Sequence, residues 1–224
     1  MSAQFYTVAS SLPRLGASFK IASPPISRFQ LEKRLKLLPE KQVTQIFAIE
    51  LLVWRSWFMP QQSVAETRIL YQQIIKNQSS FIINLIDWYF DLRSVFAAIR
   101  MRNEKKEAPE NPHDYWISNW EHRLMQKWHD ADFGLKSVYP WLPKVVVDME
   151  KNNTAAIEEF LLAHIWKHLS IIEAGHYFDF EALIIYLLRW NIVSYWSSFN
   201  KSQTLERIEK LCNSLIDWDH LSLK

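Results

Sequence analysis

The densest apolar stretch in the first half of the chain spans residues 79–106 and ends in a burst of charge. At 100° per residue, its large apolar side chains crowd one side of a helix, which predicts a central helix of a bundle. Arg93 and Arg100 share a direction within that side and need partners there, because an unpaired buried charge is very costly. The opposite side carries a narrow polar stripe, for which we expect a hydrogen-bonded seam: Asn84, Asp87, Asp91 and Arg102.

Apolar residues at helical spacing recur along most of the chain, with capping residues before them and prolines after them. The other predicted helices span residues 27–38, 40–59, 63–76, 114–132, 154–173, 180–199 and 204–215. Residues 138–150 are interrupted by two prolines, and their valine triplet has strand propensity but is too isolated to build a sheet. The pattern therefore predicts an all-α protein of stacked helical bundles, with about eight or nine helices and no significant sheet.

Two segments do not show this periodicity. Residues 4–26 predict a short irregular lead-in, extended or with a single helical turn, and residues 104–113 (EKKEAPENPH) predict a linker or exposed loop. The linker divides an N-terminal bundle, residues 1–103, from a C-terminal bundle, residues 114–224, unless the two form one continuous domain. The tripeptide YFD occurs at 89–91 and again at 177–179, and each copy is followed by an apolar helical stretch that contains an arginine. This weak internal similarity, the sequence echo, is compatible with two related bundles.

Composition narrows the class of protein. Three glycines leave few tight hairpin turns, which argues against a β-sandwich or barrel. The net charge of +2 is too small to indicate nucleic acid as the main partner. Cys212 is the only cysteine and the start of the chain does not resemble a signal peptide, so we expect a cytoplasmic protein. The best membrane candidates, residues 43–59 and 182–199, both contain charges, such as Glu50 in the first, and neither is a convincing span.

Several groups of residues could carry chemistry. His164 and His168 have a spacing that can chelate a metal, and Asp87 and Asp91 could do acid–base work. Two clusters, Glu121 with His122 and His129 with Asp130 and Asp132, could also hold a ligand, but a solvated polar face is the simpler interpretation. Because nucleophile and phosphate-binding motifs are missing, we expect neither catalysis nor a bound metal or cofactor.

Tryptophans recur at helical spacing in the predicted helix 114–132. Trp116, Trp120 and Trp128 could stack on a ligand, but few basic residues accompany them. Packing or a protein interface is the preferred interpretation, since tryptophan anchors both. These three residues are therefore the candidate interface aromatics.

A family resemblance rests on three stretches. Residues 87–93 (DWYFDLR) with 97–102 (AAIRMR) resemble the aspartate-to-arginine helix of the central-stalk socket subunit of V/A-type ATPases. Residues 178–182 (FDFEA), 186–190 (YLLRW) and Trp196 resemble the C-terminal helix of that subunit. Residues 6–13 (YTVASSLP) are similar to the start of a short bacterial branch of the family, encoded beside V-type ATPase genes.

The resemblance implies a non-catalytic, stacked-bundle protein that acts in ion transport. It would link, or help assemble, the central stalk and the rotor ring of a bacterial V-type ATPase, with these subunits as partners, and would lie in the cytoplasm at the inner membrane through the complex. The alternative function is a helical adaptor that binds another soluble protein through a Trp-rich surface. The polar residues expected to serve structure or an interface are Asp87, Asp91, Arg93, Arg100, Arg102, Asp179 and Arg189.

Overall fold

The computed structural model describes residues 3–55, 63–76 and 78–219, of which 3, 55 and 200–219 are described as backbone. These residues form α-helices and short helical turns without a strand, so the all-α prediction is confirmed. The first five helices are α1 Ala3–Ser11, α2 Arg28–Leu35, α3 Glu40–Glu50, α5 Val64–Ile75 and α6 Ser80–Asn103. Next come α7 Glu121–Gln126, α8 Leu142–Glu150, α9 Thr154–Ile172 and α10 Phe180–Asp219. Two other turns are η1 Leu51–Arg55, which is π-helical, and η2 Pro112–Asp114, which is 3₁₀.

Serine caps set the starts of three helices. Ser27 forms a reciprocal capping box with Gln30, and Ser63 forms one with Glu66. Ser79 accepts a hydrogen bond from the Ile82 amide. Each cap satisfies backbone donors that the first helical turn leaves without a partner. These starts agree with the predicted ones, whereas the end of the predicted helix 40–59 lies outside the described residues.

Other boundaries were predicted wrongly. Residues 3–11 form a helix rather than an irregular lead-in, and residues 142–150, for which no helix was predicted, form α8, whose second residue is Pro143. A proline is tolerated there because the first turn needs no amide donor. The predicted helices 180–199 and 204–215 are one helix, since the residues between them include neither proline nor glycine.

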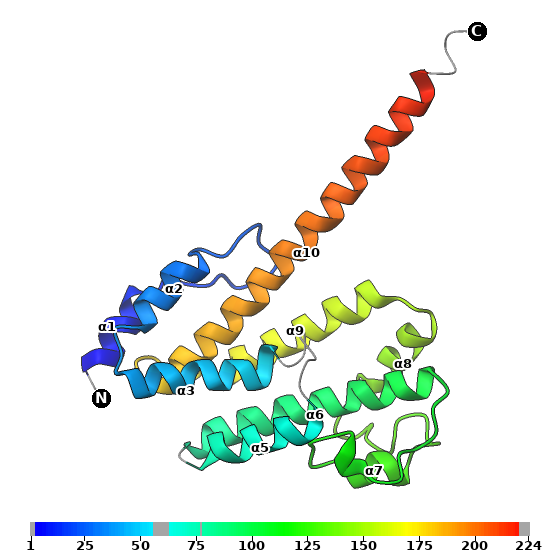
Figure 1. Ribbon diagram of the computed structural model, residues 1–224, viewed down its shortest axis with the longest axis horizontal. Helices are drawn as coiled ribbons and strands as arrows, with labels where there is room; N and C mark the ends of the chain where they lie inside the picture. Colours follow the sequence, from blue (N-terminus) through cyan, green and yellow to red (C-terminus); the bar gives the residue numbers. More distant parts are fainter. Residues whose placement is uncertain (1–2, 56–62, 77, 220–224) are drawn as a thin grey trace.

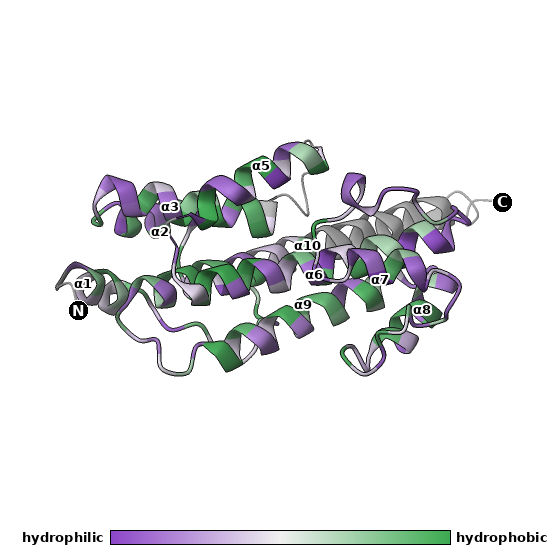
Figure 2. Ribbon diagram, turned by 90° about the horizontal axis from the view of Figure 1, so that it is seen from below, coloured by the Kyte–Doolittle hydropathy of each residue, from purple (hydrophilic) through white to green (hydrophobic). Residues whose placement is uncertain are grey.

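The apolar faces meet in two hydrophobic cores. The larger core joins α1–α3 and the first half of α6 to α9 and α10, through residues such as Leu31, Ile86 and Leu188. The smaller core joins the second half of α6 to residues 116–145. α6 and α10 lie between α3 and α5 on one side and α9 on the other (Figure 2). The expected central position of α6 is thus observed, and the larger core draws on both sides of residues 104–113.

α10 is the longest helix. Its first half packs on α3 and α9, and its second half continues beyond the rest of the body (Figure 1). No helix within the described residues is both long enough and apolar enough to cross a bilayer.

Candidate functional site

The polar stripe of α6 holds the irregular segment 112–133 against the helix. The buried Asp91 carboxylate accepts hydrogen bonds from Ser118 Oγ at 2.7 Å and from the Asn119 backbone amide at 2.8 Å. The Asn119 side-chain amide donates a third bond at 3.3 Å. These bonds compete with helical ones, so the predicted helix 114–132 is wrong except for Asp114, the last residue of η2, and the six residues of α7.

Arg102 secures the far end of the same segment. Its guanidinium donates to the carbonyls of Asp130 at 2.5 Å and Ala131 at 2.8 Å, and lies 4.1 Å from the centre of the Phe133 ring. Burial lowers its pKa, although Glu150 and Asp132 oppose that shift. Asp91 and Arg102 therefore each bind segment 112–133, whereas the sequence led us to expect hydrogen bonds among the members of the stripe.

The remaining predicted residues of α6 have separate surroundings. Asp87 accepts a hydrogen bond from the Tyr71 hydroxyl at 2.6 Å. Burial is the largest cause that raises the pKa of Tyr71, and this hydrogen bond is the second. Arg93 is half-buried, and burial together with the charge of Arg100 lowers its pKa. The prediction that Arg100 lies inside is wrong, because its side chain is 68% exposed and faces Glu104 at 3.8 Å.

The two predicted residues near α10 serve its packing. Asp179 caps the helix, since one carboxylate oxygen accepts the Ala182 amide at 2.8 Å and the other lies 2.7 Å from His176 Nδ1. The buried Arg189 pairs with Glu173 and lies 4.2 Å from the centre of the Trp166 ring. Asp91 lies within α6 whereas Asp179 precedes α10, so the two aspartates of the sequence echo hold different positions.

The three predicted interface aromatics do not form a surface. Trp116 and Trp128 are 2% and 3% exposed and stack in the smaller core, with ring centres 6.2 Å apart. Trp120 is partly buried against the same core. These three residues therefore pack in the core, as one of the two sequence interpretations expected, and do not form an interface surface.

An ion pair that the sequence did not reveal joins the buried Glu50 to the half-buried Arg28. Glu50 is 2% exposed and accepts two hydrogen bonds from Arg28, Nη1 to Oε1 at 2.6 Å and Nη2 to Oε2 at 2.7 Å. Asn191 of α10 donates to the same carboxylate at 2.8 Å. Glu50 within the apolar run 43–59 was used only to argue against a membrane span, although a charge among apolar residues also needs a partner.

A polar cleft of about 170 Å³ lies between α5, α6 and residues 117–119, and Asp87 and Asp91 line it together with Arg68 and Tyr71. Both carboxylates already accept hydrogen bonds from the protein. This arrangement favours a structural role over proton transfer.

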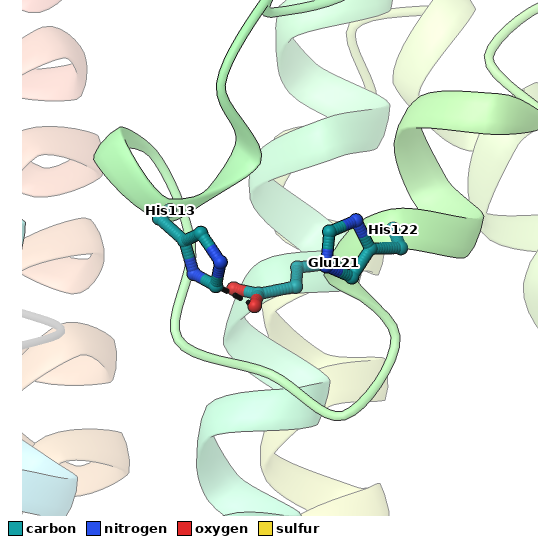
Figure 3. A group of neighbouring side chains, drawn as sticks. All are labelled: His113, Glu121 and His122. Carbon is teal, nitrogen blue, oxygen red and sulfur yellow. Dashed lines mark ion pairs between the residues drawn. The ribbon is translucent and has the colours of Figure 1, made fainter.

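Beyond this cleft, the structure brings together His113, Glu121 and His122 (Figure 3). His113 Nδ1 lies 2.8 Å from Glu121 Oε1, and one ligand atom from each of the three side chains lies within 4.8 Å of the others. His122 and Glu121 were candidates from the sequence, but His113 lay in the predicted linker. The other predicted cluster does not form: His129 is exposed, and Asp132 accepts the Gly134 amide at 2.9 Å.

His164 and His168 line an open groove of about 570 Å³ with Trp88 and Trp141. The His168 ring stacks on Trp88, with ring centres 3.7 Å apart and planes 6° apart. Burial, and secondarily the neighbouring His164, lowers the pKa of His168 to about 4. Burial and Lys167 lower the pKa of His164 as well. Burial therefore favours the neutral form of both rings, which lie against aromatic neighbours.

The low pKa of His168 predicts acid sensitivity. As the pH falls from 6.5 to about 4, the unfolded chain takes up a proton at this position and the folded chain does not, so stability is lost in that window. His168→Gln should reduce the stability difference between pH 7 and pH 5 in urea unfolding by on the order of 1 kcal/mol, allowing for solvent screening of a half-buried ring. His129→Gln, at an exposed position, is the matched control, and an equal reduction in both variants would contradict the prediction.

Residues 63–217 match the model of a protein family described as "Protein of unknown function (DUF2764)". The chain belongs to this family. The DUF2764 match begins at the cap of α5 and ends within α10, so it includes α6, Asp91, Arg102 and the segment that they bind. A comparison with curated proteins and a comparison with solved structures each find no match.

Proposed function

We propose that the protein is a non-catalytic subunit or accessory protein of a bacterial V-type ATPase. It would link the central stalk to the membrane rotor ring, or help the two to assemble, from the cytoplasmic side of the inner membrane. The observation that carries the proposal is the form of α10, one helix that is packed in the body over its first half and leaves the body over its second. Such a helix is suited to joining a folded body to another component of an assembly.

The placement of the resembling stretches supports the same role. Residues 87–102 lie in α6 and residues 180–196 lie in α10, and both helices contribute to the larger core. Their charged side chains are largely used in packing: Asp91 and Arg102 hold segment 112–133, and Arg189 pairs with Glu173. A mechanical subunit needs this kind of internal bracing, whereas an enzyme needs polar groups directed at a substrate.

Co-purification tests the proposal directly. A chromosomally tagged chain should be recovered with V-type ATPase subunits from native membranes solubilised in mild detergent. A deletion strain should assemble less of the stalk and ring into one complex. Full assembly in the deletion strain, together with no ATPase subunit in the purified sample, would refute the proposal.

Shortening α10 should separate folding from partner binding. A chain that ends at residue 199 keeps the helical residues that pack in the larger core, including Leu188 and Val193, so its melting temperature should change little. Its recovery of ATPase subunits should drop to background, because the part of α10 beyond the body is gone. Undiminished co-purification of this folded variant would show that the distal half of α10 is not the linking element.

A further inference from the structure

The cluster of His113, Glu121 and His122 has the donors of a transition-metal site. Two imidazole nitrogens and one carboxylate oxygen are the ligand set that zinc uses when it keeps a fourth position for water. The three ligand atoms lie within 4.8 Å of one another, although His113 comes from η2 and the other two residues come from α7 (Figure 3). Both histidines are exposed, so a metal ion can reach them from solvent.

Glu121 supplies a second, independent observation. Its residue is 8% exposed, and its Oε2 is buried without a hydrogen-bond partner among the described residues. The cation that faces Oε2, Arg68 Nη2, lies 3.7 Å away, beyond hydrogen-bond distance, so a metal ion bound to the same carboxylate would compensate its buried charge further. Its other oxygen, Oε1, lies beside His113.

Arg68 is the basic side chain of α5 that faces this carboxylate, and its Nη2 lies 3.7 Å from Glu121 Oε2. The same nitrogen donates to the carbonyls of Trp116 at 2.8 Å and His113 at 3.1 Å, which hold it in place. These two hydrogen bonds keep Arg68 Nη2 at the loop carbonyls and away from Oε1. Glu121 can therefore still bind a metal ion through Oε1.

We propose that His113, Glu121 and His122 bind a divalent transition-metal ion, for which Zn²⁺ is the natural probe. The two histidines would bind as neutral rings, with water completing the coordination. Binding would join η2 to α7 and so stabilise segment 112–133 at its exposed histidines. Asp91 and Arg102 already hold the same segment at Ser118 and Asp130. The proposal is independent of the ATPase role.

The second group with metal-ligand spacing is His176, Asp179 and Glu181. Its carboxylates are already in use, since Asp179 caps α10 and pairs with His176, and Glu181 accepts from Ser79 at 2.7 Å. It therefore serves as an internal control.

Titration calorimetry with ZnCl₂ on the full chain, freed of metal with a chelator and carrying no polyhistidine tag, tests the site. We expect one equivalent of Zn²⁺ to bind and to raise the melting temperature, because a ligand of the folded state stabilises it. Affinity should fall as the pH is lowered, since protons compete for the ring nitrogens. Co²⁺ in place of Zn²⁺ should give visible absorption bands from nitrogen and oxygen coordination.

Variants then assign the ligands. His113→Ala and His122→Ala should each weaken Zn²⁺ binding by more than the roughly 10–100-fold typical of losing an outer-shell partner. His129→Ala, in the same segment, and His176→Ala, in the other group, should bind as the original chain does. The histidines of the cluster are exposed, so these variants should fold, and circular dichroism would verify this. Unchanged binding in the His113→Ala/His122→Ala double variant, or no binding at micromolar Zn²⁺, would overturn the proposal.

Discussion

Replacing Arg28 with alanine should lower the free energy of unfolding by about 3–5 kcal/mol, because it leaves a buried charge without its partner. Glu50 is 2% exposed and accepts two hydrogen bonds from Arg28, so the truncated variant keeps a buried carboxylate whose remaining donor among the described residues is Asn191. Chemical denaturation at pH 7 measures the loss.

Two further variants identify the cause of the Arg28 effect. Arg28→Lys keeps the charge but cannot form both parallel bonds, so it should recover part of the stability. Lys127→Ala removes a cation whose contact with Asp130, at 3.5 Å, is exposed, and it should change stability by less than about 1 kcal/mol. A loss of about 1 kcal/mol or less in Arg28→Ala would show that Glu50 relaxes or is neutralised without its partner.

Replacing Asp91 with alanine should cost about 3 kcal/mol and loosen segment 112–133. The carboxylate accepts three hydrogen bonds from Ser118 and Asn119, and its removal leaves these donors without their acceptor. Native-state hydrogen exchange should therefore accelerate first in this segment and less in α9 or α10.

Asp87→Ala is the matched control for Asp91, one helical turn away on the same polar stripe. Within the part of the chain that the structure describes, it loses the bond from Tyr71, so its cost should be about 1 kcal/mol without faster exchange in segment 112–133. Equal acceleration in both variants would mean that the stripe as a whole, rather than Asp91, holds the segment.

Short-range signals in the sequence predicted most of the helical architecture. The caps at Ser27, Ser63 and Ser79 each act within three residues, so their chemistry is visible in the sequence itself. The central position of α6 followed from its apolar side in the same way. These elements agree with the structure because neighbours along the chain determine them.

Contacts between distant residues account for the errors. Segment 112–133 has the apolar spacing of a helix, but the bonds from Asp91 and Arg102 favour an irregular path. Residues 3–11 were predicted to be irregular but form α1, which packs against α2 and the distant α10. Periodicity along the chain carries no information about such partners.

The candidate sites follow the same division. The polar stripe of α6 could be predicted because its members repeat at helical spacing on one element. The group of His113, Glu121 and His122 could be predicted only in part, because His113 joins the other two through the fold of a loop. The acceptor of Arg28 was hidden for the same reason, since 22 residues separate it from Glu50.

Because α10 is one unbroken helix, it acts as a lever: a small tilt at its packed end moves its far end by a larger distance. The roughly 20 residues that follow residue 199 span about 30 Å at the helical rise of about 1.5 Å per residue. A tilt of about 10° at the packed end would therefore displace the tip by about 5 Å. The side chains that would act as the fulcrum include Leu188 and Asn191, so a small repacking around the Glu50 carboxylate would become a large movement at the other end of the helix.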